Sequence, residues 1–137
     1  IQEIEEALED DYYFKPVSIH INDALKFLSD RKEPNYRNSV KESISAVESI
    51  CQIITQNKNV TLGKALKRIE DHIKIHGALK NAFSQLYGYT SSEGGIRHAL
   101  LDESNIDFED AKFMLISCSA FINYLKVKIS KANLKFK

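Results

Sequence analysis

Helix-breaking residues are scarce in this chain, and their scarcity constrains its fold more than any other feature. Proline occurs only at Pro16 and Pro34, and the five glycines among the 137 residues stand at few points. Because proline and glycine are the strongest interrupters of regular structure, most of the chain is free to be helical. The sequence also lacks the alternation of apolar and polar residues that is typical of strands. We therefore predict an all-α fold.

Three helices are predicted in the N-terminal half, where apolar residues recur at helical spacing. The first is short and acidic, over residues 2–10. The second has Pro16 in its first turn, where a missing N–H costs nothing. It ends before Pro34, because the residue preceding a proline resists the α conformation. The third is expected over residues 36–56, with an apolar stripe made by Val40, Ile44, Val47, Cys51 and Ile54.

Two more helices are predicted in the C-terminal half. One begins after Thr61, a suitable N-cap, and continues to residue 86 with a bend at Gly77. The last follows Asp107 as its cap, and its inward positions are Ala111, Leu115, Cys118, Phe121, Ile122, Leu125 and Ile129. Helices of this kind with short connections predict a single domain over residues 1–137, a bundle of four principal helices preceded by the acidic lead-in at residues 1–13.

Charge and cysteine usage bound the class of protein. Nineteen basic residues balance nineteen acidic ones, so net charge gives no argument for binding nucleic acid or an anionic membrane. The acidic run at residues 3–11 and the basic tail from residue 126 are typical of solvated helix faces. Cys51 and Cys118 occupy apolar helix positions and are expected to be buried free thiols rather than a disulfide.

No signal peptide is visible, and no apolar run approaches the ~20 residues that span a bilayer. We expect a cytoplasmic protein without a membrane segment. Because the chain begins at Ile1 rather than at methionine, we also expect it to be a fragment whose upstream domain is a partner.

Metal binding is considered because His72 and His76 are four residues apart, which places two ligands on one helix face. A zinc site normally needs three or four protein ligands, and no third ligand follows from the spacing. His76 lies on the apolar stripe, which favours a hydrogen-bonded core histidine. We expect no metal and no other cofactor.

The stretch "TSSEGGIRHALLDE", residues 90–103, places Gly94 and Gly95 before Arg97 and His98. Arginine grips phosphate oxygens through a planar fork, and histidine can both take and give a proton at neutral pH. The glycines would let the backbone approach a phosphate closely, and Asp102 could orient the imidazole. These groups suit RNA cleavage without a metal. The alternative interpretation is a tight turn followed by two surface residues.

A second polar cluster opens the predicted third helix. Arg37, Asn38 and Glu42 lie in its first turns, and Glu42 follows Asn38 by one turn. They form an exposed first turn in the simpler interpretation. If this helix packs beside residues 90–103, the same side chains contact the same phosphate as supporting groups.

The residues also resemble a known family. The stretches "SDRKEPNYRNSVKESISAVESI", "LGKALKRIEDHIKIHGALKNAFSQLYGYT", "GGIRHALLDE" and "DFEDAKFMLISCSAFINYLKVK" are similar to HEPN-like bacterial abortive-infection proteins that carry AbiJ N-terminal domains. The similarity runs from about Phe14 to the end, and the final helix is its most specific part. It implies a HEPN-like four-helix bundle, a homodimer, and a role in phage defence.

Active members of that superfamily cleave RNA without a metal through an arginine followed several residues later by a histidine. Arg97 matches the arginine, and His98 matches the polar position after it. The trailing histidine would fall at residues 102–104, which are Asp102, Glu103 and Ser104. Two expectations follow: either His98 itself is the catalytic histidine, or the domain is a non-catalytic module that dimerises or senses RNA or nucleotide.

Overall fold

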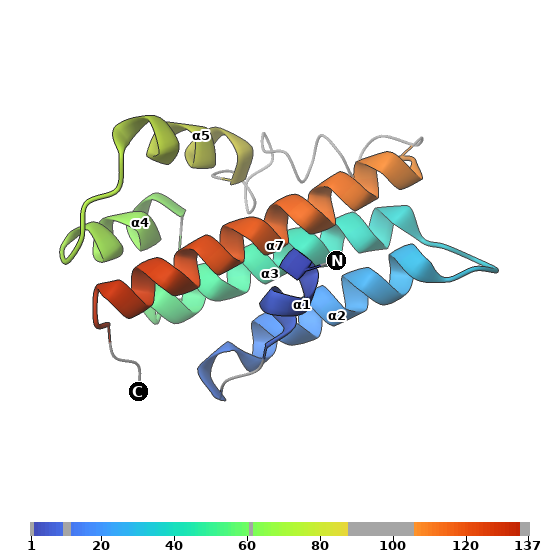
Figure 1. Cartoon of the computed structure of the whole chain (residues 1–137), viewed down its shortest axis with the longest axis horizontal. Helices are drawn as coiled ribbons and strands as arrows, with labels where there is room; N and C mark the ends of the chain where they lie inside the picture. Colours follow the sequence, from blue (N-terminus) through green and yellow to red (C-terminus); the bar gives the residue numbers. More distant parts are fainter. Residues whose placement is uncertain (1, 10–11, 61, 88–105, 135–137) are drawn as a thin grey trace.

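The computed structural model describes residues 2–9, 12–60, 62–87 and 106–134, and every regular element in these ranges is helical (Figure 1). The prediction of an all-α fold is therefore confirmed. The helices, in chain order, are α1 (Gln2–Leu8), the 3-10 helix η1 (Tyr12–Phe14), α2 (Lys15–Ser29), α3 (Tyr36–Thr55), α4 (Leu62–Glu70), α5 (Gly77–Tyr87) and α7 (Phe108–Lys131).

Helices α2 and α3 form an antiparallel hairpin. Pro16 lies in the first turn of α2, as predicted. In the connection, the Asp30 carboxylate accepts hydrogen bonds from the backbone N–H groups of Glu33 and Lys32, and these bonds lower its pKa. Asn35 then caps α3 by accepting from the Asn38 N–H at 3.0 Å. The short, capped connection leaves the two helices side by side (Figure 1).

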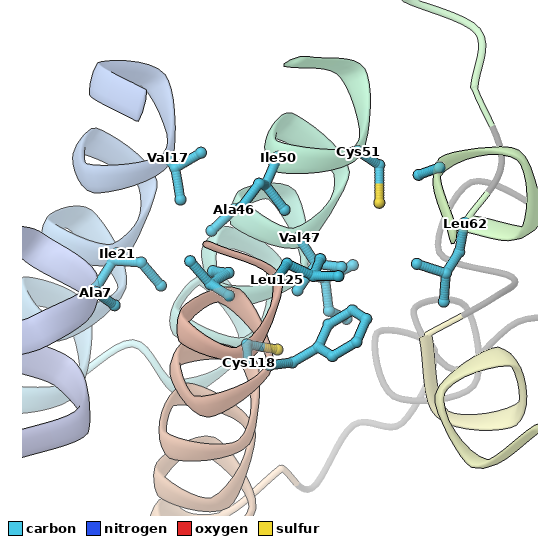
Figure 2. Close-up of a cluster of buried hydrophobic side chains, with 14 of the residues drawn as sticks. Ala7, Val17, Ile21, Ala46, Val47, Ile50, Cys51, Leu62, Cys118 and Leu125 are labelled. Atoms are coloured by element: carbon cyan, nitrogen blue, oxygen red, sulfur yellow. The ribbon is translucent and has the colours of Figure 1, made fainter. Parts of the chain in front are cut away.

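The core forms where α3 and α7 pack against each other and against α2 (Figure 2). Every residue of the two stripes predicted for the third and last helices is buried. Side chains of α2 and α4, among them Ile21 and Leu62, close the same core from the sides. Asp107 caps α7 in a capping box with Asp110, which confirms the predicted helix start.

Both cysteines are buried free thiols, as predicted. Burial, with a smaller contribution from the Glu48 charge, raises the pKa of Cys51 to about 12. Burial alone raises the pKa of the Cys118 thiol still further above its ordinary value. The sulfur atoms lie among apolar side chains of the core (Figure 2).

Helix α1 is fastened to α7 by polar contacts as well as by its buried Ile4 and Ala7. The Asn123 amide donates to the Glu3 carbonyl at 3.0 Å and to its carboxylate at 2.9 Å. Lys126 Nζ reaches the Ala7 carbonyl at 3.4 Å. The acidic N-terminal segment is therefore not a wholly solvated face, because one of its carboxylates holds α1 against the bundle.

The prediction of one bent helix from Thr61 to residue 86 is wrong in one respect, because the structure has two separate helices there, α4 and α5. Residues 71–76 separate α4 from α5, and Thr61, its expected cap, lies outside the described residues. Ile75 is 2% exposed, whereas His76 is exposed. An unbroken helix would have turned His76 inward instead of Ile75. Burying an isoleucine is favourable and burying a histidine is costly, so the chain leaves the helix.

One described helix, α7, is long and apolar enough to cross a bilayer by length and composition alone. Half of its most apolar window is buried inside the fold, and the core helix of a soluble protein passes the same test. The side of α7 that packs against α3 accounts for the buried part of this apolar character, whereas Phe113 and Val127 on the same helix are exposed.

Candidate functional site

The predicted site residues fall into two groups. One group lies in residues 88–105, outside the described residues, and follows α5 and precedes α7 in the chain. The other group is placed by α3. The first consists of Gly94, Gly95, Arg97, His98 and Asp102, and the second of Arg37, Asn38 and Glu42.

The three residues on α3 do not share one face. Asn38 and Glu42 are four residues apart, so they lie one turn apart on the same side, and both are half-buried. Arg37 is exposed and lies about 140° around the helix from Glu42. It shares its face instead with Lys41 and Glu48, because steps of four and seven residues bring side chains into line.

Glu42 has a partner that sequence reasoning missed. Its Oε2 lies 2.6 Å from Nδ1 of His20, which is on the facing helix α2. The two side chains are 19% and 34% exposed, so solvent still reaches both. When Nδ1 donates to the carboxylate, Nε2 of the neutral ring is left as an acceptor. The contact therefore fixes the orientation of the His20 ring between α2 and α3.

The sequence did contain a signal for this pair, although it could be used only with the hairpin register. His20 and Glu42 are each eleven residues from Arg31, in the connection between the two helices. The Asn35 backbone N–H donates to the Phe27 carbonyl at 2.9 Å, and these two residues are each four from Arg31, so this bond sets the register that brings His20 opposite Glu42. The Ser39 hydroxyl, which donates to the Ala24 carbonyl at 2.8 Å, follows nearly the same register.

The polar start of α3 lies next to the start of α7. The rings of Tyr36 and Phe108 have their centroids 6.1 Å apart, and Ile106 packs against the hydrophobic core. Residue 106 directly follows the segment that carries the Arg-His pair in the sequence. The chain therefore enters α7 at the end of the bundle where Arg37 and Asn38 lie.

The two histidines considered for metal binding are not on a helix. Both His72 and His76 are exposed and lie in the break between α4 and α5. This corrects the expectation that His76 is a core residue. Within the described ranges, no three or more His, Cys, Asp or Glu side chains are grouped closely enough to hold a metal ion.

The His20–Glu42 contact is expected to couple α2 to α3. In a double-mutant cycle of His20→Ala and Glu42→Ala, we expect a coupling energy of about 0.5 to 1.5 kcal/mol, measured by urea denaturation. Lys41 supplies the control, because it is exposed and one residue from Glu42 but points elsewhere. A cycle of His20→Ala with Lys41→Ala should give coupling near zero. Equal coupling in both cycles would contradict the contact.

No family model, curated protein or solved structure matches this chain. The resemblance to HEPN-like abortive-infection proteins therefore stays a prediction.

Proposed function

We propose that this chain is a HEPN-type helical domain of a bacterial phage-defence protein and that it cleaves RNA without a metal. Its reaction centre would contain Arg97 and His98, and its partners would be RNA, a second copy of the chain and an upstream domain. The proposal places the domain in the cytoplasm. In this proposal the all-α fold is a HEPN-like four-helix bundle. Helices α2, α3 and α7 are three of its helices, and α4 and α5 together take the place of the fourth.

One observation in the described residues carries the proposal. The polar start of α3 adjoins the start of α7, through the contact of Tyr36 with Phe108. Residue 106, which follows the segment with Arg97 and His98 in the sequence, leads into α7 at the end of the bundle where Arg37 and Asn38 lie, and this supports their expected role beside that segment. Arg37 and Lys41 are exposed cations on one face, as phosphate contacts require.

The proposed chemistry is an in-line attack of a ribose 2′-OH on the adjacent phosphorus. His98 takes the hydroxyl proton as the new P–O2′ bond forms, the P–O5′ bond breaks, and the leaving 5′-oxygen takes a proton from solvent water. Arg97 stabilises the charge that develops on the phosphoryl oxygens. The products are a 2′,3′-cyclic phosphate and a 5′-hydroxyl.

A ribonuclease assay in EDTA tests the proposal. We expect wild type to cleave RNA to 2′,3′-cyclic phosphate ends, and Arg97→Ala and His98→Ala each to lower the rate by about a hundredfold or more. Matched controls are Arg68→Ala, on α4, and His72→Ala, after α4, which change residues of the same types away from the start of α3 and should leave the rate unchanged. Cleavage that persists in His98→Ala, or that requires Mg²⁺, contradicts the mechanism.

A non-catalytic interaction module is the second candidate. Large apolar side chains are exposed on the outer side of α7, among them Phe113 at 61% and Val127 at 54%. Exposed apolar surface of this kind favours binding to a partner. A folded wild-type chain that leaves RNA intact in the same assay would favour this function over cleavage.

A further inference from the structure

Helix α1 is too short to be stable on its own. It has seven residues, whereas isolated helices shorter than about 12 residues are marginal in water. Its last turn has no basic residue to balance the negative end of the helix dipole, and Glu9 follows directly after it. The helical form of α1 therefore depends on its contacts with α2 and α7.

The side of α7 that faces α1 is polar. Ser119, Asn123 and Lys126 follow one another at steps of four and three residues, so they form one stripe along the helix. The contacts of Asn123 and Lys126 with α1 show which way this stripe faces. We call these three residues the polar seat of α1. The seat differs from the apolar side of α7 that packs against α3.

Both ends of α1 are held through backbone carbonyl groups. Near its start, the Asn123 amide donates to the Glu3 carbonyl at 3.0 Å. At its end, Lys126 Nζ lies 3.4 Å from the carbonyl oxygens of Ala7 and Glu9. The Lys126 ammonium thus supplies the positive charge that the last turn of α1 lacks. Asn123 and Lys126 together act as a latch on α1.

The polar seat also opposes the docking of α1. Ser119 Oγ and Asn123 Oδ1 are buried and have no hydrogen-bond partner among the described residues. Burying a polar atom without a partner costs free energy, and water supplies the partner when α1 moves away. Ile4 and Ala7, which are buried, favour the docked position. The docking of α1 is therefore a balance of opposing terms, as a releasable contact requires.

We propose that α1 is a releasable strap. It leaves the polar seat as one unit while α2, α3 and α7 stay folded, and its release uncovers the seam between α2 and α7. Local opening of this kind is typical of short elements that contribute few buried side chains. Ile21 of α2, which belongs to the same core cluster as Ala7, then becomes accessible to solvent (Figure 2). The strap does not depend on RNA cleavage, so it and the proposed function can fail separately.

Hydrogen exchange of the full chain, followed by NMR for each amide, measures the release. The protection factor is the ratio of the intrinsic exchange rate of an amide to its observed rate. For Ala7 and Leu8 we expect protection factors at least about a hundredfold below those of the most protected amides of α3, because α1 opens without the core. Low concentrations of urea should change the α1 values little, since the release exposes little surface.

Substitutions of Lys126 test the latch. Lys126→Met removes the charge and should lower the protection factors of α1 by about three- to tenfold. The most protected amides of α3 should fall by the same factor, because complete unfolding also releases α1. Lys126→Arg keeps the charge and should stay near wild type. Circular dichroism checks that each variant remains folded.

Lys112→Met is the matched control for the latch. Lys112 and Lys126 are both on α7, and each lies over an aromatic ring, with Nζ 6.0 Å from the centroid of Phe108 and 5.5 Å from that of Phe14. Lys112 is fourteen residues before Lys126, about 21 Å along the helix. Its substitution should leave the protection factors of α1 unchanged.

Ser119→Ala tests the opposing term of the polar seat. It removes a hydroxyl that is buried unpaired while α1 is docked and is hydrated when α1 leaves. The protection factors of α1 should therefore rise by about three- to tenfold.

Cys51→Ala separates release of the strap from unfolding of the core. Cys51 is 4% exposed and lies on the opposite side of the core cluster from Ala7 (Figure 2). Shortening this side chain should lower the protection factors of the most protected α3 amides by about tenfold. The protection factors of Ala7 and Leu8 should stay unchanged, because the core remains folded when α1 leaves.

The following results would overturn the proposal. Cys51→Ala lowers protection in α1 as much as in α3, which would mean that α1 leaves only when the whole chain unfolds. The amides of α1 have no protection in wild type, which would mean that α1 is not docked. Lys126→Met has no more effect on α1 than Lys112→Met, or Ser119→Ala lowers protection instead of raising it, which would remove the latch or the opposing term of the seat.

Discussion

Replacing Leu125 with alanine is expected to lower the free energy of unfolding by about 3 to 5 kcal/mol, as buried leucines typically show. Leu125 has no exposed surface and lies at the centre of the packing between α7, α3 and α2 (Figure 2). Its neighbours come from three helices, so none can shift alone to fill the space. The cost therefore includes both the lost burial and a residual cavity. Urea denaturation of the purified chain measures it.

Leu79→Ala is the matched control for this prediction. It removes the same atoms from α5, but Leu79 is 41% exposed, so we expect a loss below about 1 kcal/mol. A similar loss in both variants would show that Leu125 does not occupy the centre of the core. A small loss in both would mean that the core relaxes around Leu125, contrary to its tight packing.

The sequence predicted the long helices well because each has one dominant apolar stripe. The third helix was expected to end at residue 56, and α3 ends at Thr55, where Gln56 adopts a left-handed conformation with φ of 55°. The last helix begins at its expected cap, Asp107. In both cases local signals and the core agree, so propensity and tertiary packing select the same structure.

The fourth helix was harder because its sequence contains two competing stripes. His76 continues the phase of Leu62, Leu66 and Ile69, whereas Ile75 does not. Periodicity alone favours a continuous helix with His76 inward. Ile75 is nevertheless the buried residue, and the chain breaks to bury it. Where the helix breaks depends on which of the two side chains is buried in the core, and the spacing of apolar residues does not determine this.

Part of the candidate site could likewise be predicted from helix geometry, and part of it depends on tertiary packing. Placing Asn38 and Glu42 on one face needed only helix geometry, and it agrees with their half-buried positions on α3. Finding His20 needed the register of the α2–α3 hairpin, which depends on the length and caps of the connection at residues 30–35. Arg97 and His98, outside the described ranges, stay a prediction from sequence chemistry and resemblance.

The proposed site can carry local positive charge although the net charge of the whole chain is zero. Cations at Arg37 and Lys41 are exposed along one face of α3, while the carboxylate of Glu42 is directed to His20 on another. A site can therefore present local positive charge to a phosphate without an overall basic composition. This reconciles the proposed RNA substrate with the balanced totals, and it predicts binding that weakens with salt only modestly.

The stability of the chain is expected to fall steeply in alkali because of its two buried thiols. In the unfolded chain each thiol titrates near its ordinary pKa of about 9, whereas burial raises the pKa of Cys51 to about 12 and that of Cys118 further still. Above pH 9 the unfolded chain therefore loses protons that the folded chain retains. Deprotonation favours the unfolded state. The contribution of the protonated thiols to the free energy of unfolding is therefore fully present below pH 9 and is lost as the pH rises towards 12. Each thiol contributes about 1.4 kcal/mol per pH unit, so together they cost about 5 kcal/mol between pH 8 and 11.

Urea denaturation at pH 8 and at pH 11 measures this loss, and the Cys51→Ala/Cys118→Ala double variant isolates the thiol contribution. The variant is less stable at pH 8, because two buried side chains are shortened, but it should lose about 5 kcal/mol less than wild type on going to pH 11. Titration of lysine and tyrosine side chains is common to both proteins and cancels in the comparison. Equal losses in the two proteins would mean that the thiols ionise as readily in the folded chain as in the unfolded one, which is incompatible with their burial between α3, α4 and α7.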